Sequence, residues 1–138
     1  MTRIDLLETE PAARAPGVLY RALRPDVGFP YVAVDEAGDG YAVVREHGTP
    51  DVAGGVVLVN PFAVPGSEDD SFLADWDAAQ EALAPQQGYL GTRLHRATGS
   101  AELRFVELAR WSSPLMVARA VARQLPLPSE PALYQPLP

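Results

Sequence analysis

The chain has 138 residues, of which 47% are hydrophobic and 21% charged, enough for one domain with a sizeable core. A formal net charge of −7 argues against nucleic acid as a partner, because a protein that binds phosphates needs a basic face. The absence of cysteine excludes disulfides, thiolate metal sites and cysteine nucleophiles. The chain starts without an apolar signal core and has no apolar run of about 18 residues, so we expect a soluble, cytoplasmic protein with no membrane segment.

Residues 1–54 predict a β-rich N-terminal extension. A short strand over residues 4–7 is followed by a hairpin over residues 17–35, whose Arg-Pro-Asp-Val-Gly turn separates two alternating segments. A third short strand covers residues 41–46, and a linker rich in Pro, Gly and Asp leads to the second half. We expect the hairpin to extend or cover the edge of a sheet, because an exposed edge strand is an aggregation liability.

Residues 55–138 predict a strand–helix–strand–strand–helix–strand order. This order is the βαββαβ plan of ferredoxin-like folds, an α+β class with an antiparallel sheet. A capping box of the form S-x-x-[DE], starting at Ser67, predicts the start of the first helix, and Pro85 ends it. Ser112, Ser113 and Pro114 predict the start of the second helix.

The two halves share a pattern. The hairpin starting at Leu19 and the one starting at Leu94 both open with L-x-R-A, and one gap aligns residues 31–32 with residues 105–106. We interpret residues 17–46 as a shortened copy of the second half that lacks its opening strand and helix. Two unequal copies do not predict an open-ended repeat array.

Asn60 ends an otherwise apolar strand, where a carboxamide must find hydrogen-bond partners. One interpretation is structural: Asn60 ties a bulge before Pro61, which has no amide donor. The other is functional: Asn60 donates to a ligand carbonyl or to a developing oxyanion.

Four aromatic side chains are candidates for a binding slot near Asn60. Phe72 and Trp76 lie on the inward stripe of the first helix, and Phe105 shares a strand face with Trp111. Buried tryptophans more often belong to a core, so both interpretations stay open.

His95 and Arg93 share one face of their strand, and a histidine near neutrality can act as a general base. Glu107 could face His95 across the hairpin, although a lone strand histidine is more often a surface or interface residue. No G-x-G-x-x-G, P-loop, G-x-S-x-G or paired histidine motif is present, so we expect neither a metal nor a nucleotide cofactor.

From Val56 onward the chain resembles the antibiotic biosynthesis monooxygenase domain family. The matching segments are VVLVNPFAVP, DSFLADWDAA, GYLGTRLHRA, RFVELARW and PALYQP, in that order. LYRALRPD and YVAVDEA in the first half resemble the same hairpin, with Ala37 where Trp111 stands in the second half.

The resemblance implies a ferredoxin-like subunit that forms a homodimer, in which two sheets make a barrel. It implies oxidation of an anthrone-type or phenolic polyketide intermediate to a quinone with molecular oxygen and no cofactor, in which the protein need only bind, desolvate and polarise the substrate. Asn60 and Trp111 fall where oxygenase members carry a strand-end asparagine and a pocket tryptophan. Other members degrade heme, but the histidine of their second helix has no counterpart in PLMVARAVARQ.

Three functions remain open at this point: a cofactor-independent monooxygenase, a polyketide cyclase or isomerase using the same pocket, and a non-catalytic accessory dimer that binds a small aromatic molecule. We expect the pocket to lie between the sheet and the two helices. Asn60, Trp76 and Trp111 should form its wall, with His95 or Arg93 at its mouth.

The homodimer has a second argument in the sequence. A four-stranded sheet with both helices on one face leaves its other face apolar, and a partner copy can cover it. The apolar side chains concerned are Val57, Val59, Val106 and Leu108. The alternative is that the extra N-terminal hairpin covers this surface within one chain.

Overall fold

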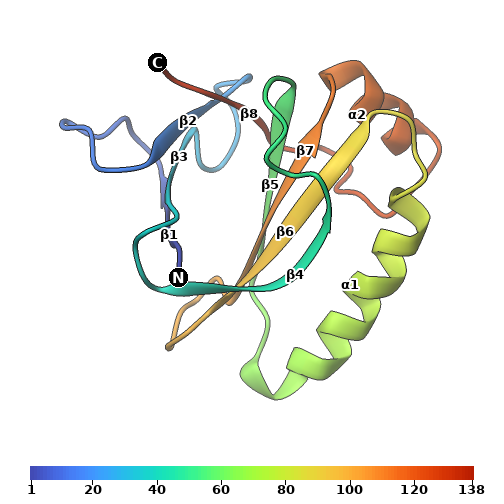
Figure 1. Ribbon diagram of the computed structural model, residues 1–138, viewed down its shortest axis with the longest axis horizontal. Helices are drawn as coiled ribbons and strands as arrows, with labels where there is room; N and C mark the ends of the chain where they lie inside the picture. Colours follow the sequence, from blue (N-terminus) through green and yellow to red (C-terminus); the bar gives the residue numbers. More distant parts are fainter.

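The computed structural model describes the whole chain, residues 1–138, as one strongly curled antiparallel sheet with two helices on its outer side (Figure 1). This arrangement confirms the predicted α+β, ferredoxin-like class. The elements are β1 (Arg3–Leu7), β2 (Val18–Ala22), β3 (Tyr31–Asp35), β4 (Tyr41–Gly48), β5 (Val56–Phe62), the 3-10 turn η1 (Gly66–Glu68), α1 (Asp69–Leu83), β6 (Tyr89–Ala97), β7 (Phe105–Trp111), α2 (Pro114–Ala122) and β8 (Leu133–Pro136).

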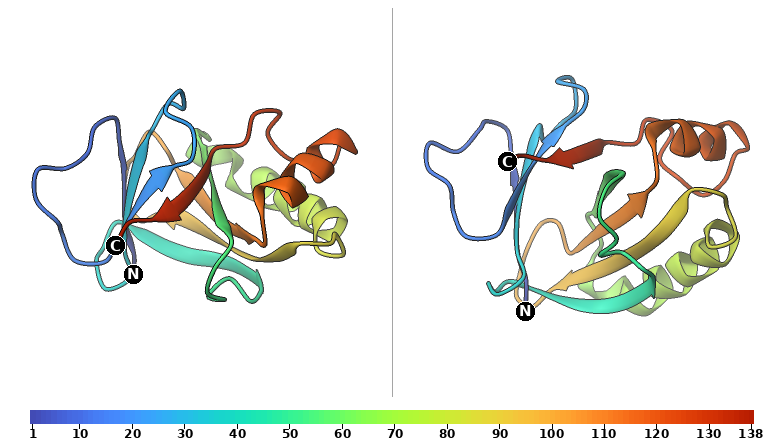
Figure 2. Two further views of the ribbon diagram at one scale, coloured as in Figure 1. Left: turned by 90° about the horizontal axis from the view of Figure 1, so that it is seen from above. Right: turned by 45° about the horizontal axis from the view of Figure 1, so that its top comes forward.

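The eight strands follow the order β1-β3-β2-β8-β5-β7-β6-β4, with every neighbouring pair antiparallel. A bridge between Thr2 and Tyr41 joins the two ends of this order, so the sheet closes on itself. In Figure 2 the N-terminal strands β1, β2 and β3 lie on the opposite side of the molecule from α1 and α2. The predicted hairpin over residues 17–35 is confirmed, and β8 ties it to β5.

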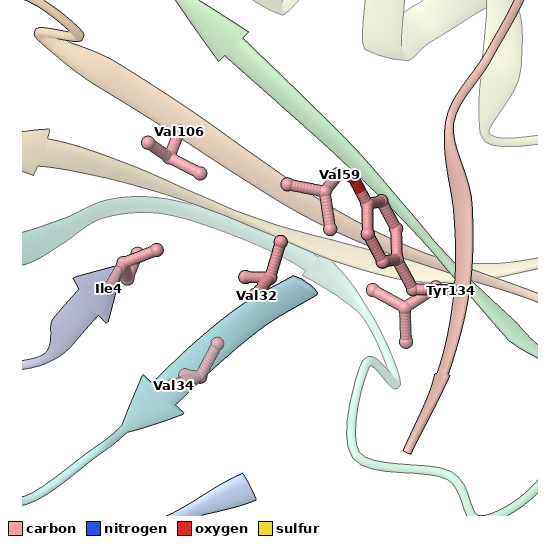
Figure 3. Packing of buried hydrophobic residues seen from close by; sticks show 7 residues of the cluster. Ile4, Val32, Val34, Val59, Val106 and Tyr134 are labelled. Carbon is pink, nitrogen blue, oxygen red and sulfur yellow. The ribbon is translucent and has the colours of Figure 1, made fainter. Parts of the chain in front are cut away.

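The interior of the curled sheet is a core to which both halves of the chain contribute. Figure 3 shows its buried members as sticks: Ile4, Val32, Val34, Val57, Val59, Val106 and Tyr134. The N-terminal strands therefore cover the apolar face of the second half within one chain. A partner copy is not needed for that purpose, so the burial argument for a homodimer does not hold.

The opposite face of β5, β6 and β7 packs against the helices. Strand alternation explains why some side chains of these strands lie inside the curled sheet and others face the helices, because successive side chains point to opposite faces of a sheet. One cluster contains Val56, Leu58, Leu83, Ala109, Trp111, Val117 and Ala120, and a second contains Leu73, Trp76, Leu94 and Phe105. All four residues from Val56 to Val59 are buried because β5 has packed layers on both sides.

The starts of the two helices differ in how far the sequence predicts them. At α2 the hydroxyl of Ser113 accepts a hydrogen bond from the Met116 amide at 3.4 Å, which confirms the predicted cap. At α1 the predicted capping box is wrong, because Ser67 lies in η1 and no side chain caps the helix. Asp69 instead accepts two hydrogen bonds from Arg104, at 2.6 and 2.7 Å. Neither helix has the length and apolar character needed to span a membrane.

Candidate functional site

A cavity of about 370 Å³ opens between α1, the helix-facing side of β5 and β7, and the segment that follows α2. This volume lies in the range of about 300–1,000 Å³ that is typical of small-molecule sites. Such sites are concave and mostly apolar, with a few polar groups. Half of its lining residues are hydrophobic. The full lining comprises Asn60, Phe62, Phe72, Asp75, Trp76, Ala79, Gln80, Leu83, Glu107, Pro126, Leu127 and Pro128.

Asn60 and Glu107 are direct cross-strand neighbours in the β5–β7 ladder. Residues opposite each other in an antiparallel pair share a face, with Cβ atoms about 4.5–5.5 Å apart. The register runs without interruption from Val56 to Phe62, so no bulge precedes Pro61 and the structural interpretation of Asn60 is wrong. The half-buried Asn60 carboxamide makes no hydrogen bond within the chain, and it lines the cavity with its polar atoms free.

Glu107 is 7% exposed, and its carboxyl group is held by a short network of polar side chains. The Thr92 hydroxyl donates to Glu107 Oε2 at 2.9 Å, and the Gln80 amide donates to the same oxygen at 3.3 Å. The Tyr89 hydroxyl in turn donates to Gln80 Oε1 at 2.5 Å, which fixes the orientation of the amide. The other carboxyl oxygen, Oε1, accepts no hydrogen bond within the chain, and Glu107 is one of the residues that line the cavity.

Burial raises the pKa of the Glu107 carboxyl, since the charged form loses its hydration. Hydrogen bonds from Thr92 and Gln80 oppose this shift by stabilising the carboxylate. The indole N–H of Trp76 acts in the same direction, although it is buried and its geometry falls short of a hydrogen bond. Burial and the Glu107 charge together raise the pKa of Tyr89, which therefore stays a neutral donor.

This arrangement places a proton acceptor and a neutral hydrogen-bond donor side by side on an aromatic-lined surface. A carboxyl group with a raised pKa is suited to general acid–base work near neutral pH. An amide beside it can donate to an oxygen that gains negative charge as a proton leaves. Phe72 and Trp76 supply flat walls of the kind that hold a ring.

His95 and Arg93 lie on the opposite face of the sheet, so the prediction that they stand at the mouth of this cavity is wrong. His95 pairs with Val106 in the β6–β7 ladder, while Glu107 pairs with Leu94. Glu107 therefore points away from His95 and cannot orient it. The physical reason is the parity of the ladder, since a shift of one residue moves a side chain to the other face.

His95 is buried on the inner face of the curled sheet, among both polar and apolar side chains. Its Nδ1 lies 3.2 Å from the Val106 carbonyl oxygen, which can only accept, so Nδ1 carries the hydrogen. Burial is the main cause that lowers the pKa of His95, and the charge of Arg93 lowers it further. Both residues line a cavity of about 70 Å³ inside the curled sheet, where Asp51 binds Arg93 through two hydrogen bonds at 2.5 and 2.6 Å.

Trp111 and Phe105 belong to the packed layer between sheet and helices and are both fully buried. The Trp111 ring contacts Tyr89, with centroids 5.0 Å apart, and does not reach the cavity, so its predicted place on the wall is wrong. Phe105 stacks on Phe72 at 4.4 Å and supports the cavity wall from behind.

Comparison with known proteins gives matches at the level of structure. No protein-family model matches the sequence, and no curated protein matches it significantly. A ferredoxin-fold protein related to antibiotic biosynthesis monooxygenases, from Listeria monocytogenes, superposes with a TM-score of 0.57 at 15% identity, covering 91% of this chain and 83% of its own. The chain has an antibiotic biosynthesis monooxygenase-like fold.

Two further structures with this antibiotic biosynthesis monooxygenase-like fold are similar to the chain. A candidate monooxygenase from Shewanella loihica is 28% identical over 62% of this chain and 92% of its own, with a TM-score of 0.50. A heme-degrading enzyme from Listeria monocytogenes is 18% identical, with a TM-score of 0.57 over 82% of this chain and 71% of its own. The monooxygenase-like fold is thus shared with proteins of more than one described activity.

The sequence analysis does not predict three polar residues near this cavity: Gln80, Thr92 and Tyr89. Gln80 carried a usable signal, because it follows Trp76 by four residues and so falls on the inward stripe of α1, where a polar side chain needs a partner. Thr92 lies on the regular part of the β6–β7 ladder and shares a face with Leu94, whereas the face of Tyr89 depends on an irregularity of the register between Tyr89 and Gly91. No group of three His, Asp or Glu side chains is placed to hold a metal ion.

Proposed function

We propose that this protein is a cofactor-independent monooxygenase that binds a small aromatic intermediate of the polyketide type, an anthrone or phenol, and oxidises it to a quinone. The observation that carries the proposal is the pair of Asn60 and Glu107, cross-strand neighbours on the floor of an aromatic-lined cavity. The monooxygenase-like fold supports it, and so does a buried carboxyl group with a raised pKa beside the amide of Asn60.

The first step would be removal of a proton from the ring system. The free Oε1 of Glu107 accepts the proton from an acidic ring carbon or hydroxyl, and the Asn60 amide donates to the oxygen on which charge accumulates. The proton transfer leaves the total charge of the cavity unchanged, because Glu107 becomes neutral as the substrate becomes an anion. This conservation matters in an apolar site that has no cation to balance a new charge.

The oxidation then needs only molecular oxygen as co-reactant. The substrate carbanion donates one electron to oxygen, and the two radicals combine to form a carbon–peroxide bond. The peroxide oxygen takes the proton back from Glu107, and the hydroperoxide loses water, with the second ring C–H supplying the other hydrogen. One oxygen atom ends in the quinone carbonyl and the other in water, so the substrate supplies all four electrons and no external reductant is required.

The same groups also suit a second candidate, a cyclase or isomerase of polyketide-type substrates. Its supporting observation is again Glu107, because proton removal and return on a carbon next to a carbonyl require a base and an oxyanion donor but no oxygen. A non-catalytic accessory protein would bind the aromatic molecule and leave it unchanged. The three functions differ in what they consume.

Oxygen uptake on an anthrone, measured with an electrode in the absence of added metal or cofactor, separates them. The proposal predicts one oxygen consumed per quinone formed, with 18O2 placing one labelled atom in the product. It also predicts that Glu107→Gln, which keeps the shape of the side chain, removes most of the enzymatic rate. Product formation without oxygen uptake would indicate the cyclase or isomerase, and binding without turnover would indicate the accessory protein.

The homodimer, the partial internal copy over residues 17–46 and the division into units 1–54 and 55–138 stay predictions. A homodimer would have to form through a surface other than the inner sheet face, which the N-terminal strands already cover. Sedimentation velocity at micromolar concentration tests it: a single species of monomer mass contradicts the homodimer, and a species of twice that mass supports it.

A further inference from the structure

The charged residues of the aromatic-lined cavity are of one sign. Asp75 and Glu107 are its only ionisable side chains, and no lysine, arginine or histidine lines it. Asp75 is exposed at the rim, whereas Glu107 lies at the base with Oε1 free of hydrogen bonds. A ligand entering this cavity therefore meets one acid at the entrance and a second at the floor.

The helix α1, which forms one wall of the cavity, adds to this excess of negative charge. The sequence of α1 contains five acidic residues, Asp69, Asp70, Asp75, Asp77 and Glu81, and no basic residue. Arg104 pairs with Asp69 and Arg45 with Asp77, while Asp75 forms no ion pair. Because the cavity wall is of low polarity, the field of an unpaired carboxylate at its rim extends into the opening.

Asp75 is also placed beside an aromatic ring. Phe72, Asp75 and Ala79 follow one another at intervals of three and four residues, so they form one stripe along α1 and all three line the cavity. A cation bound by the Asp75 carboxylate would lie next to the Phe72 ring. Aromatic faces attract cations, most strongly where water is excluded.

We infer that the ligand of this cavity is an aromatic molecule bearing a basic amine, whose ring packs against Phe72 and Trp76 and whose ammonium group pairs with Asp75 at the rim. The inference rests on the proposed function, for which it names the substrate class: an amine-bearing anthrone or phenol. The cavity discriminates against carboxylates and phosphates, because these would meet two acids and no cation.

Calorimetric titration with three probes that share one ring system tests the inference: 1-naphthylmethylammonium, 1-naphthylmethanol and 1-naphthoate. We expect the cation to bind at least tenfold more tightly than the anion, with the neutral alcohol between them. Asp75→Asn should weaken binding of the cation about threefold to fivefold, the range of an exposed ion pair, and leave the alcohol unchanged. The matched control is Glu81→Gln, which removes an equal charge from an exposed position of α1 outside the cavity and should change none of the three affinities.

The outcomes separate this inference from the proposed function. Equal affinities for cation and anion, or an Asp75→Asn variant that binds the cation as tightly as the wild type, would overturn the inference while leaving the oxygenase proposal to its own assay. Failure of all three probes to bind would also overturn the inference, and oxygen uptake on an anthrone would still decide the oxygenase proposal. The expected order of affinities combined with no oxygen uptake on an anthrone would support the inference and contradict the oxygenase.

Discussion

Val32→Ala probes whether the N-terminal strands are an integral layer of this fold. Val32 is completely buried in the interior core, where it packs with Val106 from the second half of the chain (Figure 3). The substitution removes two buried carbon atoms, each contributing about 0.8 kcal/mol, and leaves a small void. Because β3 is hydrogen-bonded on both sides, by β1 and β2, the void cannot close fully. We therefore expect the free energy of unfolding to fall by roughly 2–3 kcal/mol.

Urea unfolding followed by fluorescence and by circular dichroism measures this loss. The midpoint should fall with an unchanged slope, and both probes should report one transition, because the two halves share one core. Val43→Ala is the matched control, since Val43 lies on β4 and is 45% exposed, so its loss should be about 0.5 kcal/mol or less. A Val32→Ala variant as stable as this control would refute the packing of β3 against the second half.

Three further predictions concern titration and capping. The folded-state pKa of Glu107 is raised, so wild-type stability falls as pH rises from 4.5 through the folded pKa. Urea titrations of Glu107→Gln at several pH values should lack this fall in stability. An identical fall in the variant would contradict the burial of the carboxyl group. The folded-state pKa of His95 is lowered, mainly by burial, so stability falls as pH drops below 6.5. His95→Gln should lack that acid-side loss, and equal pH profiles would place His95 in water. Ser113→Ala should cost about 1 kcal/mol in thermal unfolding and Ser67→Ala no more than about 0.5 kcal/mol, and the reverse order would contradict the observed caps.

The order of elements was predictable because it depends on local pattern. Alternating apolar residues indicated the hairpin over residues 17–35 and the strands around it, and the apolar stripe through Trp76 and Leu83 indicated α1. These signals need no knowledge of distant residues. The sequence does not decide whether the N-terminal strands or a partner copy cover the inner sheet face, because no local pattern shows which surface packs against it.

The site was predicted in part. Asn60, Phe72, Trp76 and Glu107 do line one cavity, as strand alternation and the helical stripe indicated. The sequence places His95 beside this cavity, which is the wrong face of the sheet, because the face depends on the pairing of β6 with β7 across the turn between Ala97 and Phe105, and no local pattern fixes that register.

Turnover and melting temperature of Asn60→Ala test the central claim most directly. The Asn60 side chain makes no hydrogen bond within the chain, so its truncation should lower the free energy of unfolding by no more than about 1 kcal/mol. If the amide donates to a developing oxyanion beside Glu107, the rate of anthrone oxidation should fall by about 100-fold or more at saturating substrate. A folded Asn60→Ala variant that oxidises the anthrone at the wild-type rate would contradict the assignment of this site.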